Sequence, residues 1–275
     1  MASITRRRSI GLPNTGAGMG GAATLLYVLF IGLPVGALLF KAGQQESFFT
    51  TLTSGPALTA MRLSLVTSAI SMVVIVLVGT PFAYLLARSK SPLLRLIDTL
   101  VELPLVMPPV VAGVAMLMAF GRRGVLGAPL EDFGITLPFT TAAVIMAQVF
   151  VASPFFVRAA KLGFQSVAKD HEDISRTLGV SPWCTFWRIT LPLAAPSLLT
   201  GLALSWARAV SEFGATIMFA GNLTGKTQTM PLAIMSAMET SLDTALVLSV
   251  LLVLGSLTVL AALGYFAQRH WQGEA

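Results

Sequence analysis

The sequence predicts an all-helical integral membrane protein. Hydrophobic residues make up 55% of the 275 residues and charged residues only 11%, whereas a soluble domain carries about 25% charged residues. So few charges would not cover the surface of a soluble protein of this size. The apolar residues fall into runs of about 20, the length that an α-helix needs to cross a bilayer, and these runs are too long for barrel strands.

Six apolar runs define the expected helices. They are Ala22–Phe40, Leu63–Ala87, Leu100–Phe120, Phe139–Ala160, Leu193–Ala220 and Ala245–Ala267. The third run contains Pro104, Pro108 and Pro109. We expect the last two prolines to kink it, because proline removes a helix hydrogen bond and clashes with the preceding turn. Broken helices often line the path of a transporter.

The positions of Lys and Arg predict which helix ends face the cytoplasm, because cytoplasmic loops carry an excess of both. With the N-terminus inside, the inner segments hold most of them: Arg6, Arg7, Arg8, Arg88, Lys90, Arg95, Arg158, Lys161, Lys169, Arg176, Arg188 and Arg269. The outer segments hold Lys41, Arg62, Arg122, Arg123 and Lys226. Six helices with both termini inside fit this distribution, which also explains the net charge of +6 without nucleic-acid binding.

This arrangement divides the chain into a cytoplasmic tail of residues 1–21, a transmembrane domain of residues 22–267 and a cytoplasmic tail of residues 268–275. The basic cluster Arg6–Arg8 before an apolar run also resembles a secretory signal. Its charged region is long, however, and cleavage would leave five spans and an outer C-terminus. We therefore expect an uncleaved, multi-pass protein of the plasma or inner membrane.

The segment 161–192, between the fourth and fifth runs, is polar but has the signals of two helices. The first is expected from Asp170 to Leu178, with Gly179 as the left-handed residue that ends it. A serine followed by a proline begins the second helix as its cap and first residue. We expect Pro192 to end that second helix.

Two interpretations of this helix pair remain open. It lies on the lipid headgroups with Trp183 and Trp187 as anchors, or it docks in a groove on a soluble partner through residues such as Ile174 and Leu178. Both interpretations agree with its composition, since a ring of charged residues surrounds the apolar ones.

Arg208 and Glu212 are opposite charges four residues apart inside the fifth run. Charges at this depth are costly and usually face a cavity or one another. One interpretation is a purely structural pair. The other places Arg208 on an anion path, with Glu212 holding it or repelling anions at a closed gate. Together with Pro108 and Pro109 they are the candidate residues of a translocation path.

The sequence carries no motif that predicts catalysis. It has no HExxH and no GxSxG pattern, and His171 and His270 lie outside every apolar run. The segment Gly221–Thr227 fails as a phosphate-binding loop, because it has three residues between its glycines where four are needed. We expect no catalytic site and no metal site in this chain.

The segment 173–192 resembles the EAA loop of ATP-binding-cassette (ABC) importer permeases. That family's pattern is Glu-Ala-Ala, three residues, Gly, nine residues, then Ile-x-Leu-Pro. Gly179 and Ile189–Pro192 match it in identity and spacing. Asp173 stands for the glutamate, and Ile174 and Ser175 stand for the two alanines.

The resemblance extends over residues 60–265 and is strongest to the molybdate/tungstate branch of these permeases. The similar segments are Leu103–Gly113, Phe120–Gly127, Leu137–Ala143, Ser153–Ala160, Ala207–Thr216 and Gly221–Ile234. Sulfate/thiosulfate permeases share much of this pattern. The resemblance therefore implies import of a tetrahedral oxyanion, with molybdate or tungstate preferred and sulfate as the alternative.

The resemblance also implies a set of partners. Two copies of the chain would form the pathway, with one ATP-binding subunit beneath each copy and an external oxyanion-binding protein above. The chain itself would hold no cofactor, because ATP and magnesium bind to the partner subunit. The residues expected to couple ATP hydrolysis to transport are Glu172, Asp173, Arg176, Thr177, Leu178 and Gly179.

Two other function classes make different demands on the sequence. A secondary transporter driven by an ion gradient would show internal inverted repeats and proton carriers inside the membrane, and neither is evident in the sequence. A non-transporting scaffold subunit would explain the docking loop, but it would not explain the charged and proline-broken runs.

Overall fold

The computed structural model describes residues 14–46 and 48–272. The basic cluster Arg6–Arg8 and part of the predicted tail 1–21 lie outside these residues. The helices are α1 (Asn14–Gly43), α2 (Phe48–Leu52), α3 (Gly55–Arg88), α4 (Pro92–Val101), α5 (Leu103–Val106), α6 (Pro109–Phe120), α7 (Gly127–Asp132), α8 (Thr141–Ser166), α9 (Lys169–Thr177), α10 (Pro182–Thr185), the π-helix η1 (Phe186–Thr190), α11 (Leu191–Val210), α12 (Gly214–Ala220), α13 (Met230–Thr240) and α14 (Leu242–Gln272).

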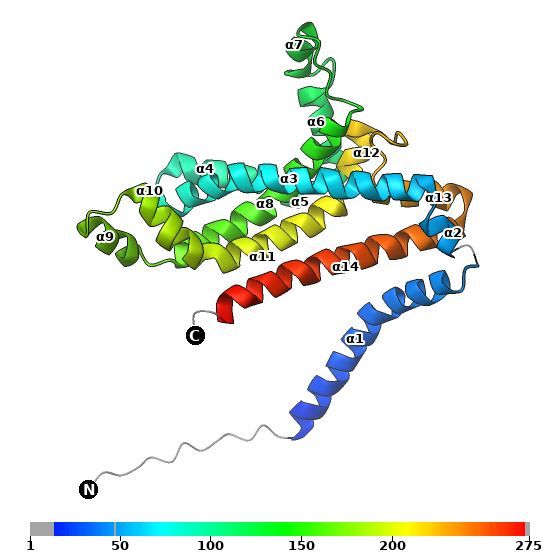
Figure 1. Ribbon diagram of the computed structural model, residues 1–275, viewed down its shortest axis with the longest axis horizontal. Coiled ribbons are helices and arrows are strands. Elements are labelled where there is room, and N and C mark those ends of the chain that lie inside the picture. Colours follow the sequence, from blue (N-terminus) through cyan, green and yellow to red (C-terminus); the bar gives the residue numbers. More distant parts are fainter. Residues whose placement is uncertain (1–13, 47, 273–275) are drawn as a thin grey trace.

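Helices α3, α8, α11 and α14 run side by side as a bundle (Figure 1). Helices α9 and α10 lie at one end of this bundle, and α2 and α13 lie at the other. Helix α1 diverges from α14. Regular structure is helical throughout the described residues, so the predicted fold class is confirmed at this level.

Hydroxyl side chains on one face of α3 bind its neighbours. Ser64 Oγ accepts a hydrogen bond of 2.7 Å from the Met230 backbone N–H. Farther along, Ser68 Oγ accepts one from the Trp206 indole, and Ser71 donates to the Gln148 side chain at 2.9 Å. Buried polar groups need internal partners in a bilayer, so these contacts both satisfy the hydroxyls and hold α3 against α8, α11 and α13.

Glycines bring α8 and α11 into close contact. A Cβ atom on Gly163 would lie 2.5 Å from Ser197 Cβ, and a Cβ on Gly201 would lie 2.7 Å from Ala159 Cβ. Real Cβ atoms do not approach this closely. Each position therefore requires glycine for the observed helix separation.

We expect Gly163→Ala and Gly201→Ala each to destabilise the protein by about 1–3 kcal/mol, the usual cost of overpacking a tight contact. Thermal unfolding in detergent measures the effect. Gly255→Ala is the matched control, because nothing lies within 4 Å of a Cβ at that position of α14. Equal unfolding temperatures for all three variants would contradict the packing described here.

Five helices of the described residues are long and apolar enough to cross a membrane. They are Gly20–Gly43, Gly55–Arg88, Thr141–Ser166, Pro182–Val210 and Leu242–Ala262. The predicted runs one, two, four and six fall on the first, second, third and fifth of these helices. The third and fifth predicted runs are each divided into shorter helices.

The third predicted run, Leu100–Phe120, is divided among α4, α5 and α6 instead of forming one kinked helix. Met107 and Pro108 adopt extended backbone, with ψ angles of 132° and 135°. A residue before proline is pushed out of the helical region by the proline ring, and two prolines in succession make the break complete. Helix α6 has 12 residues and extends about 18 Å, less than a bilayer core of about 30 Å.

The fifth predicted run, Leu193–Ala220, is also interrupted. Helix α11 ends at Val210, and α12 begins at Gly214. Glu212 therefore lies in the break and not inside a continuous helix, which corrects the prediction. A close contact explains the position of the break, because a Cβ on Gly214 would lie 2.6 Å from Pro109 Cβ at the start of α6.

The prediction that Pro192 ends the second loop helix is wrong. The helix runs without interruption from Pro182 to Val210. The π-helix η1 precedes the proline, and the Leu191 N–H donates to Phe186 O, five residues back. This wider turn accommodates the proline ring, which would otherwise clash with the preceding turn of an α-helix.

Helices α6 and α7 project away from the bundle, with α12 beside α6 (Figure 1). Gly113 of α6 permits this pairing, because a Cβ there would lie 2.6 Å from Met218 Cβ. The outer face of this arm is apolar and exposed at Val110, Val114 and Met118. Its exposed residues therefore face lipid or another protein.

Candidate functional site

The loop between α8 and α11 forms a rigid corner. Gly179 has a φ angle of +76°, which an L-residue with a side chain rarely adopts. Its N–H donates to Arg176 O at 3.0 Å, and the Val180 N–H donates to Ser175 O at 3.1 Å. This is the Schellman pattern of helix termination, and it directly follows Leu178, the C-cap of α9.

A buried side-chain hydrogen bond holds α9 against α10. The Ser175 and Thr185 hydroxyls lie 2.7 Å apart and are buried. Ser181 Oγ accepts a hydrogen bond from the Cys184 N–H and so caps α10. Ser175 departs from the alanine of the EAA pattern, and its hydroxyl provides a direct bond between the two helices.

The tip of the loop presents an exposed apolar surface with a charged edge. Ile174, Leu178, Trp183 and Trp187 are 57%, 76%, 71% and 50% exposed. The two indole rings contact each other edge to face, with centroids 5.7 Å apart. We call these four side chains the loop tip.

The charged edge of the loop tip comes from α9. Asp173 and Arg176 form an exposed ion pair of 3.4 Å. Thr177 Oγ1 donates to Ile174 O. Glu172 differs from these residues, because it is buried and points away from the loop tip toward the bundle.

The second candidate site is the break between α11 and α12. Arg208 Nη2 and Glu212 Oε2 lie 2.6 Å apart. Glu212 Oε1 accepts a hydrogen bond of 2.7 Å from the Ala215 N–H. The Glu212 side chain is fully buried, whereas that of Arg208 is 25% exposed. The buried carboxylate thus holds the start of α12 and the guanidinium in place. Of these two charged side chains, only that of Arg208 is partly exposed.

The structure brings Pro109 to the same place, because it contacts Gly214 two residues after Glu212. Pro108 precedes it as the cap of α6. The four predicted path residues therefore lie at or next to the junction of α6, α11 and α12. The predicted loop residues lie at the end of the bundle where α9 is found.

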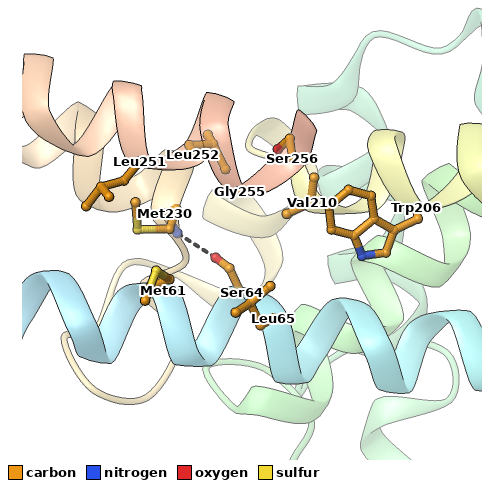
Figure 2. A pocket seen from close by; sticks show the side chains of 10 residues that line it. All are labelled: Met61, Ser64, Leu65, Trp206, Val210, Met230, Leu251, Leu252, Gly255 and Ser256. Carbon is orange, nitrogen blue, oxygen red and sulfur yellow. Dashed lines mark hydrogen bonds between the residues drawn. The ribbon is translucent and has the colours of Figure 1, made fainter. Parts of the chain in front are cut away.

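A small apolar cavity of about 50 Å³ lies beside the last residues of α11, between α3, α11, α13 and α14. Figure 2 shows Trp206 and Val210 at one side and the hydrogen bond between Ser64 and Met230 at the other. The lining contains no charged side chain. An oxyanion would lose its hydration there without compensation, so this cavity is unsuited to an anion.

Arg88 and Thr190 are site residues that sequence analysis missed. Both bind the Glu172 carboxylate. The sequence marks Arg88 only as a charge at the end of a span. In residues 14–46 and 48–272, no group of three or more His, Cys, Asp or Glu side chains is placed to hold a metal ion.

Residues 79–272 match the family model described as the inner membrane component of binding-protein-dependent transport systems. The chain belongs to this family. The matched region includes Arg88, the whole loop and the broken helix. As a member of the family, the chain is a multi-pass permease component of the inner membrane, and like its relatives it has no catalytic site of its own.

Several curated relatives are named as members of such systems. The molybdenum transport system permease protein ModB of Mycobacterium tuberculosis is 41% identical, over 86% of this chain and 89% of its own length. ModB of Escherichia coli K12 is 40% identical over 69% of this chain and 83% of its own length. The sulfate transport system permease protein CysW of Synechococcus elongatus is 35% identical over 86% and 83%, respectively.

Two solved ABC transporters share the fold. A bacterial ABC transporter involved in the import of alginate superposes with a TM-score of 0.71 at 17% identity, covering 92% of this chain and 94% of that chain. The MetNI methionine ABC transporter superposes with a TM-score of 0.60 at 19% identity, covering 82% and 99%. These likenesses confirm an ABC permease fold.

Proposed function

We propose that the chain is the permease subunit of an ATP-binding-cassette importer that moves molybdate, or the similar tungstate, into the cytoplasm. The observation that carries this proposal is the 41% identity to molybdenum permeases over most of both chains. The sulfate permease is also related, at 35% identity, so sulfate is the second candidate. The family match favours this importer over a carrier driven by an ion gradient.

In this proposal the chain crosses the membrane six times, with both termini in the cytoplasm. Helices α4, α5 and α6 together form the third, interrupted crossing, within a transmembrane domain of residues 22–267. The excess of Lys and Arg in the segments on the α9 side supports this orientation. The tails, residues 1–21 and 268–275, then lie on the cytoplasmic side with the loop 161–192.

The loop tip then docks on an ATP-binding subunit, and its corner transmits the movement of that subunit. The rigid Gly179 turn and the Ser175–Thr185 hydrogen bond support this role, because a coupling element must not bend under load. The exposed Asp173 and Arg176 supply the charged edge of the contact. Docking is favoured over anchoring in headgroups because the chain belongs to a family of multi-subunit transport systems.

A second copy of the chain completes the pathway. The exposed apolar face of α6 supports this arrangement, because a partner would cover Val110, Val114 and Met118. The α11–α12 break would then lie near the centre of the assembly. Arg208, which is paired with Glu212 but still 25% exposed, is the cationic group that an oxyanion meets there. An external binding protein delivers that anion.

Uptake by the purified complex tests the proposal. The chain is purified from native membranes in mild detergent with its bound subunits and placed in proteoliposomes that contain ATP. Labelled molybdate is then supplied on its external binding protein. We expect uptake that requires ATP, persists with ionophores and is reduced by excess tungstate.

Two results would contradict this proposal. Uptake by the isolated chain without ATP would instead establish a secondary carrier. Competition by sulfate as strong as that by tungstate would assign the chain to sulfate transport.

A further inference from the structure

The buried Glu172 carboxylate joins three segments at the base of the loop. Its Oε1 atom lies 2.6 Å from Arg88 Nη2 at the end of α3. The same oxygen accepts a hydrogen bond of 3.1 Å from the Thr190 hydroxyl in η1. The side chains of Arg88 and Glu172 are 15% and 8% exposed, so solvent screens their attraction weakly.

Arg88 also holds the junction between α8 and α9. Both of its terminal nitrogens donate to Val167 O at 3.3 Å. Its guanidinium lies 5.8 Å from the centre of the Tyr84 ring, and this ring packs edge to face on Phe164 and Phe186. Arg88 thus contacts the entry and the body of the loop, and Tyr84 of the same helix contacts Phe186 at its exit.

No covalent link connects α3 to the loop in this region, since the two are separated along the chain by α4 to α8. The chain enters α9 through Val167 and Ala168, which have extended ψ angles of 115° and 134°. Such a joint transmits force poorly, because its dihedral angles are not held by helix hydrogen bonds. The exposed Asp173–Arg176 pair joins residues of α9 only.

We infer that Arg88 and Glu172 are positioning residues that make α3 move together with the coupling loop. The inference rests on the proposed function. A push on α9 reaches α3 through the buried ion pair, because separating the two would leave a charge buried without a partner. From α3 the movement reaches the pathway, since Ser68 binds Trp206, two residues before Arg208.

The amount of molybdate imported per ATP hydrolysed tests this role, because a merely structural role would not change that ratio. For Glu172→Gln and Arg88→Gln we expect ATP-binding subunits to remain bound and the ratio to fall about tenfold, within the usual range of coupling between sites. Arg88→Lys keeps the charge and should restore much of the ratio. An unchanged ratio in the assembled variants would overturn the inference, as would loss of the ATP-binding subunits from Glu172→Gln.

Asp98→Asn is the matched control. It breaks the Lys161–Asp98 ion pair, which has a similar length of 2.7 Å and joins α4 to α8. We expect the ratio to stay unchanged in this variant. A fall as large as that of Glu172→Gln would show that any ion pair of this region affects coupling, which would overturn the specific role of Glu172. If Glu172→Gln fails to fold, Thr190→Val removes only the hydroxyl contact and should lower the ratio in the same direction.

A distance measurement tests the inference without any transported anion. Spin labels are placed at Lys90→Cys and Asp170→Cys, both exposed, in the Cys184→Ser background of the complete complex. We expect one narrow distance that ATP does not change, and a broad distribution after Glu172→Gln. A distance that shifts with ATP in the otherwise unchanged chain would overturn the inference. Absence of molybdate uptake with a constant distance would instead refute only the proposed substrate.

Discussion

A Gly179→Pro variant should purify without the ATP-binding subunits that accompany the unchanged chain. Proline holds φ near −65°, whereas Gly179 has a φ angle of +76° and donates its N–H to Arg176 O. Helices α9 and α10 would therefore meet at a different angle. We expect binding of the ATP-binding subunit to weaken about a hundredfold, as when a residue that shapes an interface is lost.

Asp173→Arg and Gly225→Pro make this experiment specific. Asp173→Arg reverses a charge on the exposed edge and leaves the backbone of the corner intact. If this variant loses the ATP-binding subunits, the loss is due to the contact between the loop and those subunits. Gly225 also has a positive φ angle, +78°, but lies in the turn between α12 and α13. We expect Gly225→Pro to retain the subunits. Retention by Gly179→Pro and Asp173→Arg as well would disprove docking through this loop.

An Arg208→Ala variant should lose uptake by about a hundredfold or more while the complex still assembles. The change removes the partly exposed cation and leaves the buried Glu212 carboxylate without its partner. An unpaired buried charge costs about 3 kcal/mol of stability, so thermal unfolding is measured beside molybdate uptake in proteoliposomes. Normal uptake by Arg208→Ala would remove Arg208 from the pathway.

The double variant Arg208→Ala/Glu212→Gln separates the two roles of Arg208. If the arginine only neutralises Glu212, the double variant should regain uptake, because Gln keeps an oxygen that accepts from the Ala215 N–H. If the arginine contacts the anion, uptake should stay lost although stability recovers. We expect the second result, because the guanidinium is partly exposed and the carboxylate is not.

Long apolar runs made four spans predictable, because a helix that crosses a bilayer needs such a run whatever surrounds it. The breaks were harder to predict. The gap after Val210 depends on the contact of Gly214 with Pro109 and on the bond from the Ala215 N–H to Glu212. The first of these contacts joins residues about a hundred positions apart in the sequence.

In the candidate sites too, local features were predictable and contacts between distant residues were not. The Gly179 turn and the Ser181 cap were predictable, because both depend on residues within one helical turn. The partners of Glu172 were not, since Arg88 lies 84 positions away and Thr190 lies beyond the corner. The prediction that Pro192 ends the second loop helix was wrong because the π-helix before it has no recognisable local signal.

Helix α11 (Leu191–Val210) reaches from the base of the loop to Arg208, next to the α11–α12 break. At 1.5 Å per residue, Arg208 lies about 26 Å along the helix axis from Leu191. A rotation of about 5° at the loop end of α11 would therefore displace the far end by about 2 Å, an amplification that follows from the length of the helix. A displacement of about 2 Å is enough to break a hydrogen bond, so a small turn at the base of the loop is enough to make or break a contact at Arg208.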